Sequence, residues 1–155
     1  MTVMIGQVVP DFEFSATSEL EGKLSDYRGK NVVIYFYPKD NTPGCTSESK
    51  DFTTHYAAFE KLNTVIFGVS KDSMPSHEKF KSKYKMPFEL IADKDEIICE
   101  LFDVIKLKHF MGKKYMGIER STFLIDTKGV LRQEWRKVKV NGHVEAVLNA
   151  IGSYL

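Results

Sequence analysis

The sequence predicts an α/β fold in which a mostly parallel sheet is covered by helices on both faces. Segments with strand-like and helix-like patterns alternate along the chain, an order typical of parallel strands joined by helices. The strongest strand signal, Val32–Tyr37 (VVIYFY), is apolar and aromatic throughout, as expected of a strand buried on both faces. The 155 residues contain no repeat, low-complexity tract or Pro/Gly-rich linker, so we expect one domain over residues 1–155.

The first half of the chain is expected to alternate strands with helices. After Val32–Tyr37, a helix is predicted from about Cys45 to Lys61. Apolar side chains recur on one face of that helix at near-helical spacing: Phe52, Tyr56, Phe59 and Leu62. Thr64–Ser70 (TVIFGVS) predicts a second buried strand. Pro75–Tyr84 predicts a polar surface helix that turns its aromatic residues inward: Phe80 and Tyr84.

The second half is expected to add a short strand, a helix, a hairpin and a closing helix. Phe88–Asp93 (FELIAD) predicts the short strand. The next helix is predicted from apolar residues at i, i+3, i+4 and i+7: Ile98, Leu101, Phe102 and Ile105. Ser121–Ile125 and Val130–Trp135 predict a hairpin around the turn Asp-Thr-Lys-Gly. Val144–Leu155 predicts an amphipathic closing helix, with Trp135 packed beneath it.

Composition and charge favour an ordinary globular protein. With 43% hydrophobic residues, 28% charged residues and a net charge of +1, nothing global predicts binding to nucleic acid or to a membrane surface. The two cysteines stand 54 positions apart and form no disulfide framework, which suits a reducing compartment. The first ten residues lack the pattern of a secretory signal, and no run approaches the ~20 apolar residues of a membrane span. We therefore expect a cytoplasmic protein.

Cys45 is the candidate reactive group. It lies in the first turn of a predicted helix, where free N–H groups and the helix dipole favour an anion such as a thiolate. Thr42 offers a hydroxyl that can donate to the sulfur or to a bound oxygen. Pro38 and Pro43 have no N–H, stiffen the turn and limit water around the sulfur. A structural, core-filling cysteine is the competing interpretation, and this position at a helix start disfavours it.

Thiolate formation alone does not make such a site a good catalyst. A thiol that ionises more readily is also a weaker nucleophile, so the two effects largely cancel. The site must also orient the substrate and stabilise the leaving group, and a fixed cation with several donors suits that task. Arg120 opens the predicted strand Ser121–Ile125 and lies beside the sulfur if that strand neighbours Val32–Tyr37.

These residues resemble those of the peroxiredoxins. Pro38, Thr42 and Cys45 match the P-x-x-x-T-x-x-C signature, and Arg120 matches the arginine that completes the site in that family. The strings FYPKDNTPGCTSE and FMGKKYMGIERSTFLID resemble the bacterioferritin comigratory protein branch, also called peroxiredoxin Q. The similarity runs over nearly the whole chain, from GQVVPDFEF to the last helix.

The resemblance implies a thioredoxin-like fold and a thiol-dependent peroxidase that reduces hydrogen peroxide and organic hydroperoxides. Cys45 would attack the peroxide and become a sulfenic acid. Thr42 and Arg120, with the N–H groups of Gly44 and Cys45, would hold the two peroxide oxygens. Glu48 would help to fix the arginine. The resemblance implies no metal, haem, flavin or other cofactor, and members of this branch are often monomers, which is our expectation here.

One departure from that branch concerns the thiol that resolves the sulfenic acid. Many members have a second cysteine five positions after the first, where this chain has Lys50, and the next predicted helix has no cysteine either. Cys99 lies beside the apolar face of its helix, where a small hydrophobic filler is the plain interpretation. We therefore predict a 1-Cys mechanism with an external thiol from thioredoxin or from a glutaredoxin–glutathione system. Resolution of Cys45 by Cys99 remains the alternative.

Other signals point to weaker alternatives. The four histidines show no metal-ligand spacing with one another or with the cysteines, so we predict no metal site. His55 lies about 15 Å from Cys45 along one predicted helix, too far for a Cys–His hydrolase. A C-x-x-C oxidoreductase requires a cysteine where Glu48 stands. A peroxide sensor that reacts once at Cys45 remains open. A basic segment is interpreted as a solvated loop: Lys106, Lys108, Lys113 and Lys114.

Overall fold

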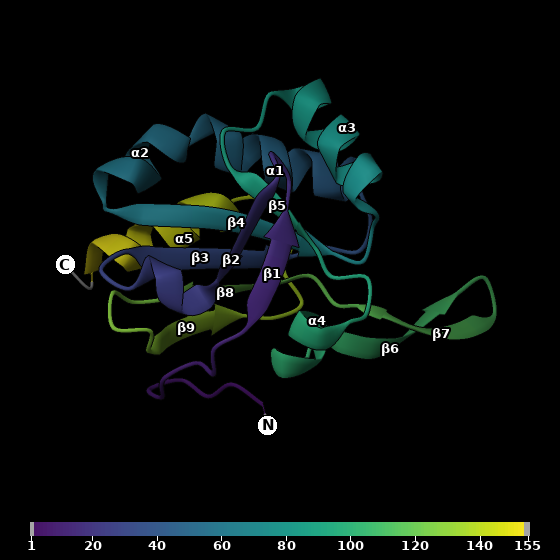
Figure 1. Ribbon diagram of the computed structural model, residues 1–155. Coiled ribbons are helices and arrows are strands. Elements are labelled where there is room, and N and C mark those ends of the chain that lie inside the picture. Colours follow the sequence, from purple (N-terminus) through teal and green to yellow (C-terminus); the bar gives the residue numbers. More distant parts are fainter. Residues whose placement is uncertain (1, 154–155) are drawn as a thin grey trace.

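A computed structural model describes residues 2–153. Its elements in chain order (Figure 1) are β1 (Glu13–Ala16), β2 (Leu20–Lys23), η1 (Leu24–Tyr27), β3 (Asn31–Phe36), α1 (Pro43–Thr54), α2 (Tyr56–Lys61), β4 (Thr64–Ser70), α3 (Met74–Tyr84), β5 (Glu89–Ala92), α4 (Ile97–Leu101), β6 (Ile105–Phe110), β7 (Lys113–Ile118), β8 (Ser121–Ile125), β9 (Leu131–Trp135) and α5 (His143–Ser153). None of the described helices is long and apolar enough to cross a membrane.

The central sheet is mixed, which corrects the expectation of a mostly parallel sheet. Its seven described strands run in the order β2-β1-β5-β4-β3-β8-β9. Only β3–β4 and β4–β5 pair in parallel, whereas the other neighbours pair antiparallel. Two antiparallel hairpins, β1–β2 and β8–β9, extend the parallel centre on either side. The α/β class with helices on both faces is confirmed. The prediction of mostly parallel strand pairing was wrong because β8 pairs antiparallel with β3.

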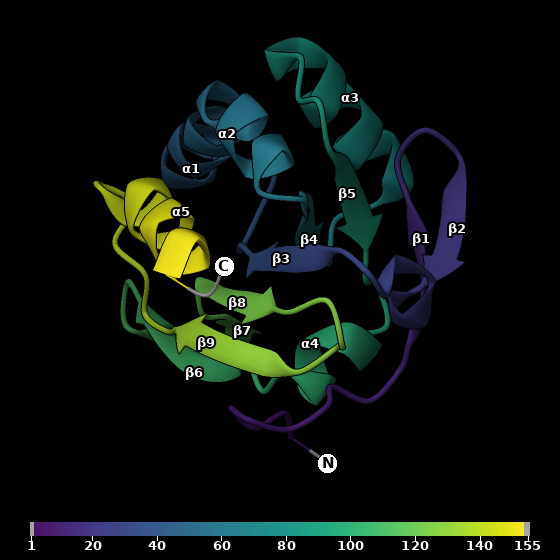
Figure 2. The same ribbon diagram turned by 90° about the vertical axis from the view of Figure 1, so that its left-hand side faces the viewer.

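Strand β3 separates two hydrophobic cores. All six of its residues are buried, and successive side chains point to opposite faces. Ile34 and Phe36 pack on the face covered by α4 and the N-terminal segment, whereas Val33 and Tyr35 pack on the face covered by α1, α2, α3 and α5. Figure 2 shows these helices on the two sides of β3. The apolar run VVIYFY is therefore buried on both faces, as predicted.

Several predicted elements are confirmed and others are wrong in extent. The strand Thr64–Ser70 and the hairpin β8–β9 lie where they were expected, and Trp135 packs beneath α5. The long helix after Cys45 divides at His55 into α1 and α2. Helix α4 ends at Leu101. Ile105, which was predicted to be the fourth apolar residue of this helix, instead begins strand β6. The closing helix runs to Ser153, and the last two residues of the predicted helix lie outside the described residues.

Two hairpins escaped the sequence prediction. Strands β1 and β2 are only four residues each, too short for their alternation of exposed and more buried side chains to predict a strand from sequence. The segment interpreted as a basic loop is the hairpin β6–β7, with its strands paired from Ile105↔Ile118 to Phe110↔Lys113. Its lysines hide the strand pattern because most of this hairpin faces solvent and needs no apolar face.

We expect Gly68→Ala to destabilise the fold by about 1–3 kcal/mol, since a side chain here overpacks the core. A Cβ on Gly68 would lie 2.8 Å from both Leu90 and the Tyr35 ring. That ring stacks on Phe52 at 4.5 Å, so a shift would reach α1. Urea unfolding tests this against Gly152→Ala, where nothing lies within 4 Å and a helical alanine should be neutral or stabilising. Equal midpoints for the two variants would contradict the overpacking argument.

Candidate active site

Cys45 lies in the first turn of α1, directly after the loop that leaves β3. Thr42 is the N-cap and Pro43 the first helical residue, a position that tolerates the missing N–H of proline. Asn41 adopts a left-handed backbone with φ of 60°, which asparagine accepts more readily than most residues. The Cys45 side chain is 1% exposed and packs at the edge of the core beneath α1.

Arg120 reaches Cys45 because β8 pairs with β3. Ser121 is opposite Phe36 in that antiparallel register, so Arg120 stands just beyond the end of β3. Its Nη2 donates to Cys45 Sγ at 3.3 Å, and its Nη1 donates to Glu48 Oε1 at 2.7 Å. A Cβ on Gly44 would lie 3.1 Å from Nη2, so glycine leaves the guanidinium the room to approach.

Glu48 is a buried carboxyl that faces Arg120 from the second turn of α1. Its side chain has no exposed surface, and its second oxygen, Oε2, has no hydrogen-bond partner among the described residues. Burial raises the pKa of Glu48 to about 7, and the Arg120 guanidinium keeps that pKa from rising further. Burial on its own lowers the pKa of Arg120, but Glu48 and Cys45 together outweigh it and raise that pKa. The structure thus brings Cys45, Arg120 and Glu48 into one contact.

The Thr42 hydroxyl directs its proton away from the sulfur in this structure. Its Oγ1 donates to the Lys39 carbonyl oxygen at 2.8 Å. A hydroxyl has one proton, so while this bond is made Thr42 can accept from a molecule bound beside it but cannot donate to it. The side chain also leaves α1 without a side-chain cap, so Thr42 does not occupy the N–H groups of the first turn.

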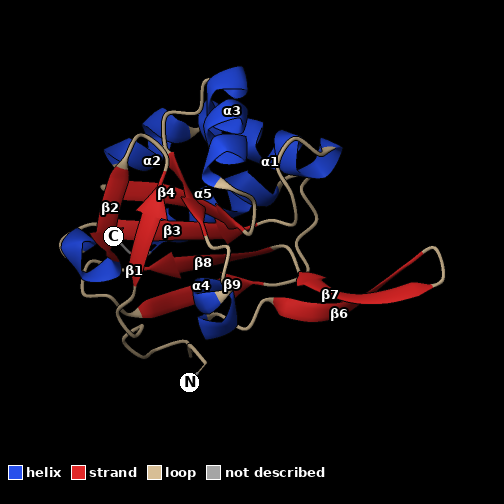
Figure 3. Cartoon of the chain, turned by 45° about the vertical axis from the view of Figure 1, so that its right-hand side comes forward, coloured by secondary structure: helices blue, strands red, loops and turns tan. Residues whose placement is uncertain are grey.

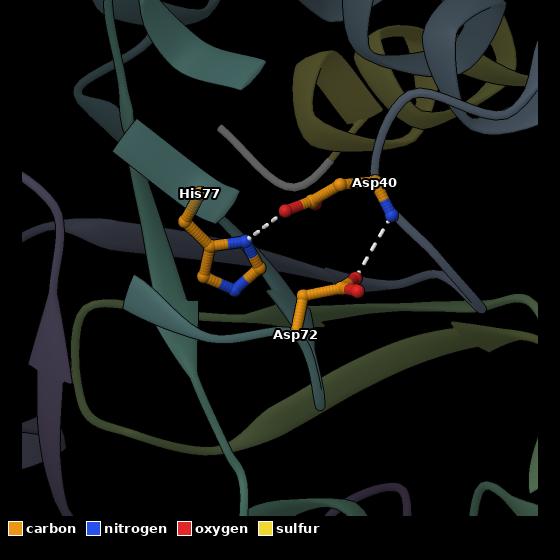
Figure 4. A group of neighbouring side chains, drawn as sticks. All are labelled: Asp40, Asp72 and His77. Carbon is orange, nitrogen blue, oxygen red and sulfur yellow. Dashed lines mark hydrogen bonds and ion pairs between the residues drawn. The ribbon is translucent and has the colours of Figure 1, made fainter. Parts of the chain in front are cut away.

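A buried network fixes the loop between β3 and α1. Asp40 accepts hydrogen bonds from the Tyr37 hydroxyl at 2.6 Å and the Ser76 hydroxyl at 2.8 Å, and it contacts His77 Nδ1 at 2.7 Å. The Asp40 backbone N–H donates to Asp72 at 2.8 Å (Figure 4). The loop, which begins at half-buried Pro38, is therefore tied to the start of α3 and the end of β4.

Asp40, Asp72 and His77 are also the described residues whose ligand-type atoms lie within 4.8 Å of one another. The two ring nitrogens of His77 are both engaged, Nδ1 with Asp40 and Nε2 with the Ile91 carbonyl oxygen at 2.9 Å. A carbonyl only accepts, so Nε2 carries a proton, and the contact between Nδ1 and the carboxyl holds one more. This group of residues therefore suits a buried hydrogen-bond network, here called the brace around Asp40, better than a metal site.

Sequence reasoning missed this network because its members come from three separate segments: the loop after β3, the loop after β4 and the start of α3. His77 shows no spacing pattern with another candidate residue, and Tyr37, Ser76 and Asp72 carry no motif. Asp40 lies inside the segment that joins Pro38 to Cys45. That position was the one feature of the sequence that could have pointed to a role for Asp40 at the site.

Cys99 lies far from this arrangement in the packing of the molecule. It is fully buried in the core on the α4 face, whereas Cys45 packs in the core on the α1 face, so the sheet stands between them. Burial raises the pKa of the Cys99 thiol well above its usual range, and the neighbouring Asp93 adds to this effect. The structure does not bring Cys99 to the other site residues.

Comparisons with known proteins agree on one family. Residues 5–134 match the AhpC/TSA family. The chain is 54% identical to peroxiredoxin Bcp of Bacillus subtilis over 151 residues, which cover 97% of this chain and 96% of that protein. A structure of the Xanthomonas campestris bacterioferritin comigratory protein, described for its alkyl peroxide reduction, matches with a TM-score of 0.88 at 46% identity, covering 92% and 91% of the two chains. A Xylella fastidiosa PrxQ mutant matches with a TM-score of 0.93 at 40% identity, covering 99% and 98%.

The raised pKa of Glu48 predicts a pH-dependent stability. Its folded-state value of about 7 lies above the unfolded value of 4.5, so folding binds a proton between these pH values. Stability attributable to Glu48 therefore falls as pH rises through this window. We expect Glu48→Gln to reduce that fall by about 1–3 kcal/mol between about pH 5 and pH 8. Chemical denaturation at each pH measures it.

The control for this pH profile is Glu145→Gln, an exposed position on α5. Burial lowers the pKa of His143 to about 4, so His143 weakens the fold as pH falls below about 6.5. That opposite trend is present in all three proteins and cancels in the comparison. Parallel pH profiles for wild type and Glu48→Gln would rule out the raised carboxyl pKa.

Proposed function

Since the chain belongs to the AhpC/TSA family and is a peroxiredoxin, a thiol-dependent peroxidase, we propose that Cys45 is the residue that attacks the peroxide. Its substrates are hydrogen peroxide and organic hydroperoxides. The observation that carries this proposal is the 3.3 Å contact from Arg120 Nη2 to Cys45 Sγ at the start of a helix. The X. campestris relative, described for alkyl peroxide reduction, supports organic hydroperoxides as a substrate class.

In the first step the Cys45 thiolate attacks one oxygen of the peroxide, ROOH. An S–O bond forms as the O–O bond breaks, the sulfur is oxidised by two electrons, and RO⁻ leaves. The sulfur becomes a sulfenic acid, and a proton converts RO⁻ to the alcohol or to water. Each turnover therefore needs the thiolate at the start and stabilisation of the negative charge as it moves to the leaving oxygen.

Arg120 and the first turn of α1 supply that stabilisation. The guanidinium favours the thiolate and donates to the peroxide oxygen as charge develops on it, together with the N–H groups of Gly44 and Cys45. Glu48 holds the guanidinium through Nη1, so that Nη2 stays directed at the sulfur. Thr42 accepts the O–H of the peroxide because its own proton is committed to Lys39. Pro38 and Pro43 stiffen the loop that presents these groups.

An external thiol restores the enzyme in a 1-Cys mechanism. The position five residues after Cys45 holds Lys50, an exposed side chain over the Tyr84 ring, and Cys99 is buried on the other side of the sheet. A thiol R′SH attacks the sulfenic acid, giving a mixed disulfide and water. A second thiol then displaces Cys45 as a thiolate and leaves with R′ as a disulfide. Thioredoxin, or glutaredoxin with glutathione, supplies these thiols.

The enzyme acts as a cytoplasmic monomer in this proposal, without a cofactor, and its role is antioxidant defence. Internal resolution by Cys99 is the alternative within the same family, and a one-time peroxide sensor is the alternative without turnover. The sheet between the two cysteines argues against the first, because a disulfide needs Cα atoms no more than about 6.8 Å apart.

Intact-mass analysis after one equivalent of hydrogen peroxide tests the proposal. We expect wild type and Cys99→Ser to gain one oxygen that a sulfenic-acid trap captures, and Cys45→Ser to gain none. Repeated peroxide consumption with dithiothreitol should separate an enzyme from a sensor, which would react once and stop. A loss of two hydrogens that Cys99→Ser abolishes would instead establish the internal disulfide.

Thr42→Val should slow the reaction of Cys45 with hydrogen peroxide by about 100-fold, because valine keeps the shape but cannot accept the peroxide proton. Thr42→Ser keeps the hydroxyl and should stay within about fivefold of wild type. Rapid-quench intact mass gives the rate constants. If both variants react at the wild-type rate, the acceptor role of Thr42 is wrong.

A further inference from the structure

The hairpin β6–β7 separates charge from the rest of the molecule. It projects beyond the sheet as a two-stranded arm (Figures 1 and 3). Residues 105–118 contain four lysines and no Asp or Glu, whereas the remaining residues contain 18 Lys and Arg against 21 Asp and Glu, a net charge of −3. A basic arm on an otherwise acidic chain favours an acidic partner at that arm.

The pairing register divides the arm into two faces. One face carries Lys106, Lys108, Phe110, Lys113, Tyr115 and Gly117, and the other carries Ile105, Leu107, His109, Lys114, Met116 and Ile118. At the base of the second face, Ile118 is buried in the core on the α4 side of the sheet. The first face is named here the Lys108 face and the second the Leu107 face.

The Lys108 face borders the candidate active site. A Cβ on Gly117 would lie 3.1 Å from the Tyr115 ring and 3.4 Å from the Lys108 side chain, so both side chains lie over this glycine. Burial, followed by the positive charge of Arg120, lowers the pKa of Lys108, and the charge of Cys45 opposes this shift. The geometry agrees, because the Lys108 face is turned away from the α4-side core that holds Ile118, whereas Cys45 packs in the core on the other side of the sheet.

Large apolar side chains stand exposed on this arm. Phe110 is 65% and Tyr115 48% exposed on the Lys108 face, and Met111 at the tip is 86% exposed. Met111 and Gly112 both have positive φ, which matches a tight two-residue hairpin turn. Such a turn favours Asn or Gly at the first position, so the methionine there holds apolar surface in solvent in a backbone conformation that its side chain disfavours. Aromatic residues and methionine are enriched at protein-binding surfaces relative to the rest of a protein's surface.

We propose that the Lys108 face is the docking surface for the protein that reduces oxidised Cys45. This inference rests on the proposed external-thiol mechanism. The partner is a thiol protein whose reactive cysteine is surrounded by apolar surface and an acidic rim. Phe110 and Tyr115 pack against the apolar surface, while Lys108 and Lys113 pair with the rim and steer the encounter. The partner's thiol then attacks the sulfenic acid at Cys45, and water leaves as the mixed disulfide forms.

A second copy of this chain fits the arm poorly. Two Lys108 faces packed against each other would bring six lysines together with no acidic residue from either arm, and like charges opposite one another are unfavourable. The Leu107 face also carries apolar residues, but its base packs through Ile118 into the core on the α4 side, so a thiol docked there is directed away from Cys45 on the other side of the sheet.

Lys113 and Lys114 provide a matched test because they are adjacent, exposed and on opposite faces. Peroxidase turnover is measured with thioredoxin, its reductase and NADPH, with glutaredoxin and glutathione, and with dithiothreitol as a small thiol. We expect Lys113→Glu to lower kcat/KM for a reducing protein by about tenfold and Lys114→Glu by less than about twofold. Phe110→Ser and Leu107→Ser form the corresponding apolar pair. Dithiothreitol turnover should be unchanged in all four variants.

Raising ionic strength from about 20 mM to about 200 mM should lower kcat/KM more in wild type than in Lys113→Glu, because salt screens the steering charge. Equal effects of the Lys113 and Lys114 substitutions would overturn the docking surface. Turnover with dithiothreitol but with neither protein would also overturn it. So would wild-type binding to vesicles of phosphatidylglycerol and phosphatidylcholine that Phe110→Ser abolishes while protein-driven turnover stays unchanged. If Cys45 takes up no oxygen from peroxide, the proposed function itself has failed.

Discussion

The ion pair between Arg120 and Glu48 is the interaction on which the site depends. Glu48 is buried in α1, so its carboxyl has lost most of its hydration, and only the guanidinium offsets that loss. Because the pair uses Nη1, the second nitrogen is left for Cys45. Loss of either partner leaves a buried charge or carboxyl unpaired, and the contact at the sulfur is lost with it. Stability and reactivity are therefore coupled in the same three side chains.

The mixed sheet is what makes this contact possible. Strand β3 ends just before the loop that leads to Cys45, and its neighbour β8 begins just after Arg120. In an antiparallel pair the end of one strand adjoins the start of the other, so the two groups meet at one edge. A parallel β8 would have placed Arg120 at the opposite end of the sheet. The hydrogen bonds of the brace around Asp40 then fix the loop between β3 and α1, which holds the N-terminus of α1 in place beside Arg120.

The sequence predicted elements that local residue patterns encode, and it missed features that depend on which distant segments pair. The buried strands and the hairpin β8–β9 follow from apolar runs and turn residues. The proximity of Cys45 and Arg120 was expected from the resemblance to the peroxiredoxins, and only if the two strands became neighbours. The direction of the sheet depends on which strands become neighbours, and no local pattern encodes that choice. The Thr42 proton is directed by the Lys39 carbonyl, and His77 by Asp40 and Ile91. Such contacts are visible only once the loop is folded.

The hairpin β6–β7 and the arginine are consecutive in the chain, which raises the question of whether docking disturbs catalysis. Only Glu119 separates Arg120 from the end of β7. The backbone is tied on both sides of the arginine, since the Glu119 N–H donates to the Val104 carbonyl at 2.7 Å and the Val138 N–H donates to the Arg120 carbonyl at 3.0 Å. These two hydrogen bonds anchor the base of the arm, so a movement of the arm is not expected to shift the Arg120 backbone. In the proposed mechanism, these bonds would let a reductant dock on the arm without displacing Arg120 from the sulfur.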